Sequence, residues 1–380
     1  MASHGYLIYL IRAGVPNRTR TLNQLSRSGG PNPTDLLDEL EARFSVYGDT
    51  YQSDKKNAEG FRVREASRIG RSLRLRIHKG PEGNPGETYN IETNESEDTG
   101  DTTALLSALR ATVYIPEKSY FGLLFVERTG GRHLKELLAR TIFKPVALNR
   151  NLAIRLESFA EVDDWRSELG DQGVLRISES LVASQSQDAS TPDDTVVRVV
   201  AEGTKVRQVS DDIKEQLFAR LERIFRTIRV RANLAPLEDR RYVYVEKEES
   251  ASQTLQVRRK APKSVFTVQD EEEYQALVEE LASLNEADEN PALRSTLQEL
   301  VPIERDGLKS QRWEVALGED KPERSFVVEG TSVPQFVYLT QGRLLDNLLR
   351  QTWEAHATRI FSVLGVSVAD DWLLKKVQSN

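Results

Sequence analysis

Two runs of alternating side chains, joined at Gly70, constrain the fold of this chain more than any other feature. Within residues 61–80 apolar side chains alternate with polar and basic ones, the pattern of β-strands with one face in a core. A glycine between two such runs predicts an antiparallel hairpin or two neighbouring strands. The apolar series is Phe61, Val63, Leu73, Leu75 and Ile77. The chain therefore needs a sheet with at least one covered face.

The rest of the chain mixes helical and extended patterns. Apolar residues at helical spacing predict helices in residues 34–48, from about Arg132, and in residues 211–230, 270–286, 290–301 and 343–361. Extended patterns predict strands in residues 6–11, 111–116, 120–127, 195–203, 240–248 and 334–339, and a hairpin in residues 311–330. This mixture predicts an α+β fold whose sheets are mostly antiparallel or mixed and are packed with amphipathic helices.

A length of 380 residues is enough for two domains. The best candidate for a linker is SQSQDASTPDD, residues 184–194, which is polar, lacks large apolar residues and contains Pro192. We therefore expect an N-terminal domain over residues 1–183, a linker over 184–195 and a C-terminal domain over 196–380.

Composition excludes several kinds of site. The chain has no cysteine, which excludes disulfides, thiolate metal sites and cysteine nucleophiles, and we expect a cytoplasmic protein. Its four histidines are scattered without metal-ligand spacing, so we expect no metal and no cofactor. No segment has the roughly 20 apolar residues of a membrane span. Because the formal net charge is −7, any site for a polyanion must be a local patch.

The hairpin supplies the first such patch. Residues 61–80 hold seven arginines and lysines against Glu65 alone. If the strands pair with their apolar faces aligned, Arg62, Arg64, Arg74 and Arg76 project from one face. Four guanidinium groups side by side favour an anion lying across them, and phosphate oxygens match their donors. The alternative is a solvated outer face neutralised by acidic loops such as residues 92–101.

A second patch lies where an apolar strand is followed by a glycine turn and an amphipathic segment. Backbone amides of such a turn at a helix N-terminus can bind an anion. The predicted contacts are Arg128, Thr129, Gly130, Gly131, Arg132 and Lys135. The stretch is neither a Walker A loop nor a dinucleotide-binding glycine motif. The alternative is that the two glycines only let the chain turn tightly.

Two further patterns are weaker. Arg220, Arg223, Arg226 and Arg229 follow the polar side of the helix predicted over residues 211–230. We interpret them as a solvated face, with nucleic acid or an acidic helix such as residues 270–284 as alternative partners. Asp306, Glu319 and Lys321 resemble the acidic and basic set of a metal-dependent nuclease, but "LGEDKPE" has the composition of a hairpin tip.

The sequence therefore favours a non-catalytic protein that binds the phosphate backbone of DNA, or less readily RNA, without reading base sequence. An accessory role in DNA maintenance or in defence against foreign DNA would fit. A different class of function is a protein–protein interaction or self-assembling scaffold subunit of a multi-component system, since residues 269–289 hold nine acidic side chains and no lysine or arginine. The third hypothesis is the nuclease.

Overall fold

A computed structural model describes most of the chain. The described residues are 4–15, 18–20, 22, 25, 34–54, 58–82, 86–90, 95–99, 104–150, 152–172, 174–183, 196–202, 211–250, 253–260, 266–286, 308–317, 324–329, 335–369 and 372–373.

The chain forms two compact units, each assembled from separate segments. Unit 1 consists of Met1–Leu156, Glu238–Pro262 and Val337–Asn380, and unit 2 of Glu157–Leu237 and Lys263–Phe336. This division differs from the two continuous domains predicted above, because the last helix of the chain packs on the sheet formed by the first 156 residues. The predicted linker, residues 184–195, lies outside the described residues.

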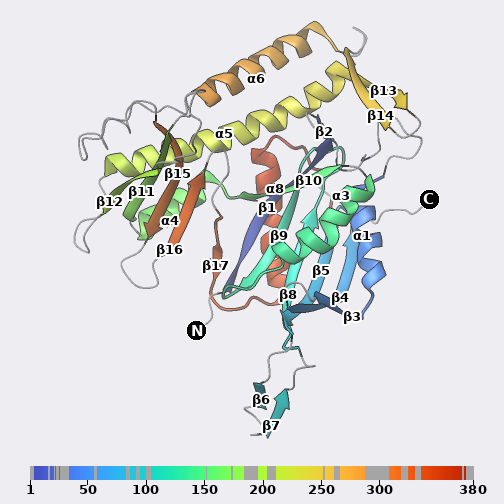
Figure 1. Ribbon diagram of the computed structural model, residues 1–380, viewed down its shortest axis with the longest axis vertical. Coiled ribbons are helices and arrows are strands. Elements are labelled where there is room, and N and C mark those ends of the chain that lie inside the picture. Colours follow the sequence, from blue (N-terminus) through green and yellow to red (C-terminus); the bar gives the residue numbers. More distant parts are fainter. Residues whose placement is uncertain are drawn as a thin grey trace. The chain divides into compact units, whose positions relative to one another are not determined.

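Unit 1 is built on a nine-stranded sheet with the order β10-β1-β9-β8-β5-β4-β3, in which β17 and β2 also pair with β1 (Figure 1). Its strands are β1 (His4–Val15), β2 (Arg18–Arg20), β3 (Tyr51–Asp54), β4 (Glu59–Ile69), β5 (Ser72–Pro81), β8 (Ser107–Tyr114), β9 (Gly122–Thr129), β10 (Ala153–Phe159) and β17 (Tyr338–Thr340). The neighbouring strands from β1 to β3 in this order are antiparallel. The sheet and its helices confirm the predicted mixed α+β fold.

The predicted hairpin is the β4–β5 pair. Gly70 closes it with a φ of +55°, a conformation that glycine adopts without a steric cost. The pairing contains a β-bulge between Val63 and Glu65, because Val63 lies opposite Ile77 but Glu65 lies opposite Arg76. Residues on β4 after the bulge therefore face the opposite way from what simple alternation predicts.

Helices cover one face of this sheet. They are α1 (Leu36–Tyr47), α2 (Lys135–Leu138), a π-helical turn (Ala139–Phe143) and α3 (Lys144–Arg150). Helix α1 begins where the Asp35 carboxylate accepts a hydrogen bond of 2.9 Å from the Leu37 amide. Their apolar side chains meet the inward residues of β1, β4, β5, β8 and β9 in one continuous core. That core includes the whole apolar series predicted from the hairpin.

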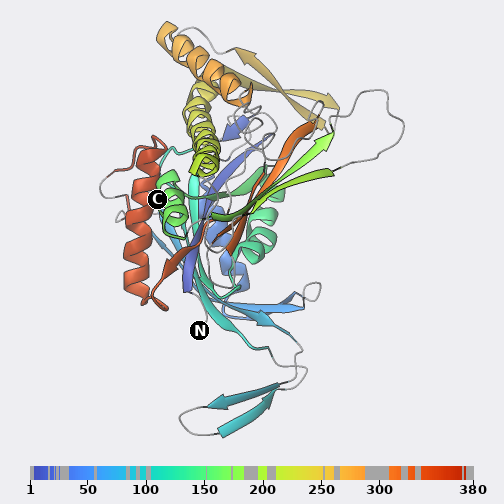
Figure 2. The ribbon, with the colours of Figure 1, turned by 90° about the vertical axis from the view of Figure 1, so that its left-hand side faces the viewer.

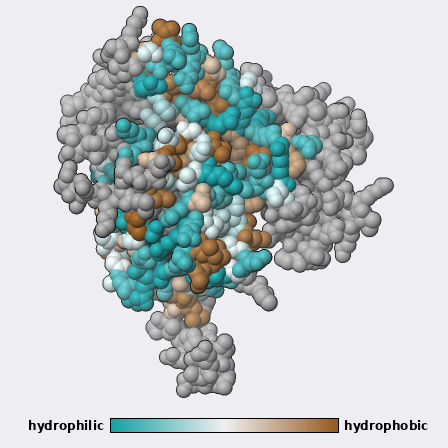
Figure 3. All heavy atoms as spheres, turned by 180° about the vertical axis from the view of Figure 1, so that it is seen from behind, coloured by the Kyte–Doolittle hydropathy of each residue, from teal (hydrophilic) through white to brown (hydrophobic). Residues whose placement is uncertain are grey.

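Helix α8 (Asp346–Val363) covers the other face of the sheet, opposite α1 and α3 (Figure 2). Trp353 is 1% exposed, and its ring lies 5.8 Å from that of Phe125 and 6.0 Å from that of Tyr6. The surface seen from behind is largely hydrophilic, with separate apolar patches (Figure 3). Exposed apolar side chains of α8 and the residue before it are Leu345, Leu348 and Val363.

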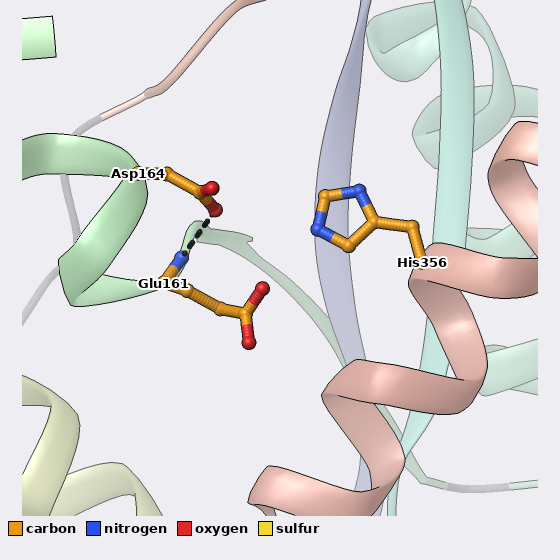
Figure 4. Close-up of side chains that lie close together, drawn as sticks. All are labelled: Glu161, Asp164 and His356. Carbon is orange, nitrogen blue, oxygen red and sulfur yellow. Dashed lines mark hydrogen bonds between the residues drawn. The ribbon is translucent and has the colours of Figure 1, made fainter. Parts of the chain in front are cut away.

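The inner side of α8 also carries a buried histidine. His356 projects from the helix (Figure 4), and its Nδ1 lies 3.2 Å from the Tyr6 hydroxyl. The ring stands edge-on to Tyr338, with ring centroids 4.7 Å apart. His356 thus joins the aromatic side chains that hold α8 against β1 and β17.

Unit 2 contains a four-stranded antiparallel sheet in the order β12-β11-β15-β16. Its elements are α4 (Val162–Gln172), β11 (Val174–Ala183), β12 (Val196–Glu202), most of α5 (Asp211–Arg241), α6 (Val268–Glu286), β15 (Leu308–Leu317) and β16 (Arg324–Glu329). Helix α4 starts with a capping contact, in which the Glu161 amide donates to the Asp164 carboxylate over 3.3 Å (Figure 4). The helix predicted over residues 290–301 lies outside the described residues.

Two further antiparallel pairs of strands are β6 (Gly86–Asn90) with β7 (Glu95–Thr99), and β13 (Tyr242–Ser250) with β14 (Gln253–Lys260). In the part of the chain that the structure describes, no helix combines the length and the apolar character needed to span a bilayer.

Replacement of Trp353 should strongly destabilise unit 1. We expect Trp353→Ala to lower the free energy of unfolding by about 3–5 kcal/mol, because it leaves a cavity between α8 and the sheet. The matched control is Gln351→Ala on the exposed side of the same helix, which should change it by less than about 0.5 kcal/mol. Urea unfolding followed by circular dichroism measures both, and equal effects would contradict the packing described.

Candidate functional site

A buried ion pair lies between α8 and the sheet. Arg110 on β8 and Glu127 on β9 are 8% and 3% exposed. The Arg110 guanidinium donates to both Glu127 oxygens over 2.9 and 2.7 Å, and the Arg110 backbone amide donates to Oε2 over 3.0 Å. Such fork geometry holds both side chains in fixed positions.

The buried pair organises charged groups that lie closer to solvent. Arg343, in the segment before α8, donates to Glu127 Oε1 over 3.0 Å and to the Ala108 carbonyl over 2.6 Å. Arg110 donates to Asp346, the first residue of α8, over 2.6 Å. Asp346 also forms an ion pair with Arg76. The beginning of α8 is therefore tied to β5, β8 and β9 through charged contacts.

Two of the predicted arginines share a single carboxylate. Arg62 lies 2.8 Å and Arg64 3.0 Å from Asp49, which follows α1 and is itself exposed. These ion pairs lower the pKa of Asp49, with the hydrogen bond from Arg62 as the largest cause. One carboxylate cannot neutralise two guanidinium groups, so the group formed by Arg62, Arg64 and Asp49 carries a net positive charge.

Arg74 occupies a different environment from the other three predicted arginines. Its guanidinium lies 2.8 Å from Glu354 of α8, and its side chain is 17% exposed. Arg350, one turn earlier on α8, pairs with Glu65 of β4 over 3.4 Å. Arg74 therefore helps to hold α8 on the sheet and has little surface left for a ligand.

Among the described residues, the ion pairs formed around Asp49 and α8 contain more cations than anions. Seven arginines form ion pairs with five carboxylates; the arginines are Arg62, Arg64, Arg74, Arg76, Arg110, Arg343 and Arg350, and the carboxylates are Asp49, Glu65, Glu127, Asp346 and Glu354. Four of the arginines have side chains that are 34–45% exposed, and we call them the arginine surface: Arg62, Arg64, Arg76 and Arg343.

His78 lies within the arginine surface. Its cross-strand neighbours are Arg62 on β4 and Ala108 on β8. Burial is the largest cause of a pKa below the ordinary value of 6.5 at this histidine. The positive charges around it lower the pKa further, in the order Arg64, Arg62, Arg76 and Arg343. The imidazole is therefore neutral near pH 7, in a region of positive potential.

The glycine turn forms a tight hairpin end instead of the start of a helix. The amides of Thr129 and Arg132 donate to each other's carbonyl oxygens over 3.1 and 3.0 Å, and Gly130 between them has a φ of +59°. Helix α2 begins only at Lys135. The amides of Thr129 and Arg132 are thus already bound within the turn and are not available to an anion.

The charged residues around the turn point to several places. Arg132 donates to the Ser107 hydroxyl over 2.8 Å. Lys135 lies 3.0 Å from Glu136 and 5.4 Å from the centre of the Tyr9 ring. Arg128, at the end of β9, is half-buried. These contacts do not gather the side chains around one point.

The remaining candidates fall in unit 2. The apolar stripe of α5 is buried at Leu217, Leu221 and Ile224, and Arg226 on its polar side pairs with Glu280 of α6. This contact corresponds to one alternative from the sequence analysis, in which the arginines of this helix face the acidic helix of residues 270–284. Asp306, Glu319 and Lys321, the nuclease candidates, lie outside the described residues.

Sequence reasoning missed Arg110, Glu127 and Arg343. A signal for the first two was present, because Arg110 and Glu127 are charged residues next to long apolar runs that form central strands. A charged residue in such a position is rarely buried without a partner of opposite sign. Nothing local in the sequence indicates that Arg343 reaches them.

Comparison of the chain with protein-family models, with curated proteins and with solved structures gave no match. The function is therefore inferred from the geometry of unit 1.

Loss of the Glu127 charge should destabilise unit 1. We expect Glu127→Gln to lower the free energy of unfolding by about 3–5 kcal/mol, because it leaves the buried Arg110 guanidinium without its counter-charge. Glu65→Gln, in a partly exposed pair, should cost less than about 1 kcal/mol and serves as the control. Urea unfolding at neutral pH compares the two variants, and a small effect of Glu127→Gln would contradict the importance of the buried pair.

The same carboxylate should make the protein sensitive to acid. Burial by itself raises the pKa of Glu127, but the hydrogen bonds from Arg110 and Arg343 outweigh it, so the pKa lies below the ordinary value of 4.5. A lowered pKa gives stability that is fully present above pH 4.5 and is lost as the pH falls through the folded-state pKa. Unfolding midpoints measured between pH 7 and about pH 3 should therefore fall more steeply for the wild type than for Glu127→Gln.

The turn at Gly130 has its own test. Gly130→Ala should lower the free energy of unfolding by about 1 kcal/mol, because alanine is strained at positive φ even though no atom lies within 4 Å of the added Cβ. Gly131 also has open space around an added Cβ, but its φ is not positive. Gly131→Ala should therefore change the free energy of unfolding by less than about 0.5 kcal/mol. Thermal unfolding of the two variants separates a conformational requirement from a general intolerance of side chains there.

Proposed function

We propose that unit 1 binds the phosphate backbone of a nucleic acid, without reading base sequence, through the arginine surface. The proposal rests chiefly on one observation: Arg62 and Arg64 are both partly exposed and share a single carboxylate, Asp49, within the described part of the chain. Phosphate oxygens of a passing backbone would supply the missing negative charge, and they match the planar fork of guanidinium donors.

The other members of the surface support the same ligand. Arg62 and Arg64 belong to β4, Arg76 belongs to β5, and Arg343 lies in the segment before α8. The four cations of the arginine surface therefore come from three separate parts of the chain. Their spread suits a chain of phosphates better than a single small anion. Arg62, Arg64 and Arg76 are among the residues that the sequence pattern suggested for this role, whereas Arg343 is not.

The contacts give no reason to expect base recognition. Sequence readout needs side chains placed against base edges, and this proposal assigns all four guanidinium groups of the arginine surface to phosphate oxygens. The preference for DNA over RNA, and an accessory role in DNA maintenance or defence, remain part of this proposal and depend on the probes that bind.

Fluorescence anisotropy with labelled single- and double-stranded DNA and RNA tests the proposal. The variant is Arg62→Gln/Arg64→Gln, which removes two charges without touching the buried Arg110–Glu127 pair. We expect affinity to fall about tenfold or more at low salt, and the slope of log K against log salt to become shallower by about 2, since about 0.9 counterion is released per phosphate contact on duplex DNA.

The matched control removes the same charge from unit 2. Arg226→Gln/Arg229→Gln changes two exposed arginines of α5 and should leave affinity and salt dependence unchanged. Equal weakening by both double variants would show that only net charge matters. Failure of the folded wild type to bind any probe would reject the proposal and leave the protein-interaction or scaffold alternative.

A further inference from the structure

We propose that His78 is itself a phosphate ligand: it becomes protonated when the polyanion binds and then donates a hydrogen bond to a phosphate oxygen. This inference rests on the proposed function and goes beyond it, because it adds a residue with a different chemistry and makes binding depend on pH.

His78 stands at the centre of the arginine surface. Arg62 is its cross-strand neighbour on β4, and Arg76 lies two residues earlier on the same face of β5. On the other side its neighbour is Ala108, whose carbonyl accepts the hydrogen bond from Arg343. An anion bridging the arginines of β4 and the segment before α8 must therefore pass beside this imidazole.

Among the described residues, the four arginines whose charges act on the ring each have a carboxylate partner. Asp49 binds the two arginines of β4, and Asp346 and Glu65 bind Arg76. Glu127 is buried against Arg110 and Arg343. These four carboxylates thus each bind at least one arginine.

The imidazole of His78, in contrast, has no hydrogen bond or ion pair within the described part of the chain. It is half-buried, with two ring nitrogens that can take part in hydrogen bonds. A partly buried ring among cations gains nothing from being charged in the free protein, which agrees with its lowered pKa. It can gain a strong charge-assisted hydrogen bond once an anion is present.

Binding reverses the electrostatics at the ring. A phosphodiester carries a permanent negative charge, and placing it across the arginines favours the imidazolium form. One proton moves from solvent to His78, no covalent bond changes, and the complex gains one positive charge. By linkage, affinity must then rise as the pH falls, by at most about tenfold per pH unit for one proton.

The test measures affinity for one DNA probe at about pH 6, 7 and 8 at constant ionic strength. The probe has no terminal phosphate, because a phosphomonoester has a pKa of about 6 and would titrate in the same range. Wild type, His78→Gln and His78→Arg are compared after their folds are checked by circular dichroism. His4→Gln is the control for another partly exposed histidine.

We expect the wild type and His4→Gln to bind about three- to tenfold more tightly at about pH 6 than at about pH 8. His78→Gln should bind with the same affinity at all three values, and His78→Arg should bind tightly at all of them because its charge is permanent. Calorimetry in buffers of different ionisation enthalpy should show uptake of up to one proton by the wild type and none by His78→Gln.

The outcomes separate this inference from the proposed function. If all proteins bind but His78→Gln or His78→Arg keeps the pH dependence of the wild type, or the wild type shows none, the role of His78 is rejected and the arginine surface stands. If the folded wild type binds no probe at any pH, the proposed function fails, and the role of His78 fails with it.

Discussion

The Arg110–Glu127 pair joins two central strands beneath α8, and the charged groups nearer to solvent are arranged around it. A charge taken out of water costs several kcal/mol unless a partner and hydrogen bonds compensate it. Glu127 has these compensations, because both of its oxygens accept from Arg110 and one also accepts from Arg343. This requirement accounts for the position of Arg343, which donates to Glu127. It also accounts for the position of Asp346, which accepts a hydrogen bond from Arg110.

Helix α8 packs against two chemically different parts of one sheet face. Around β1 and β9 that face is aromatic and apolar, and α8 offers Trp353, Ile360 and Phe361. Around β4, β5 and β8 the face is charged, and α8 contributes the anions Asp346 and Glu354 and the cation Arg350. The helix is therefore fixed by apolar burial along one side and by ion pairs along the other.

Much of the fold could be predicted from local pattern. The hairpin, β1, α1 and the long helix α5 follow from alternation, helical spacing and caps, which depend on residues close in sequence. The discontinuous units could not be predicted in this way, because nothing near residues 346–363 specifies the sheet on which they pack. The site was predicted only in part for the same reason: Arg74 is covered by Glu354, a residue 280 positions away.

The bulge on β4 determines the face of the sheet on which each arginine of this strand lies. Before it, Arg62 faces away from α1; after it, Arg68 faces α1 and forms an ion pair with Asp38, although the two arginines are an even number of residues apart. The side on which each arginine emerges thus depends on the count of residues between them. Deletion of the extra residue at the bulge would restore simple alternation and leave both faces unchanged, whereas one added residue elsewhere in the strand would turn the residues beyond it to the opposite face. The distribution of charge over this surface therefore depends on the position of the bulge and on the length of β4 as well as on which residues are present.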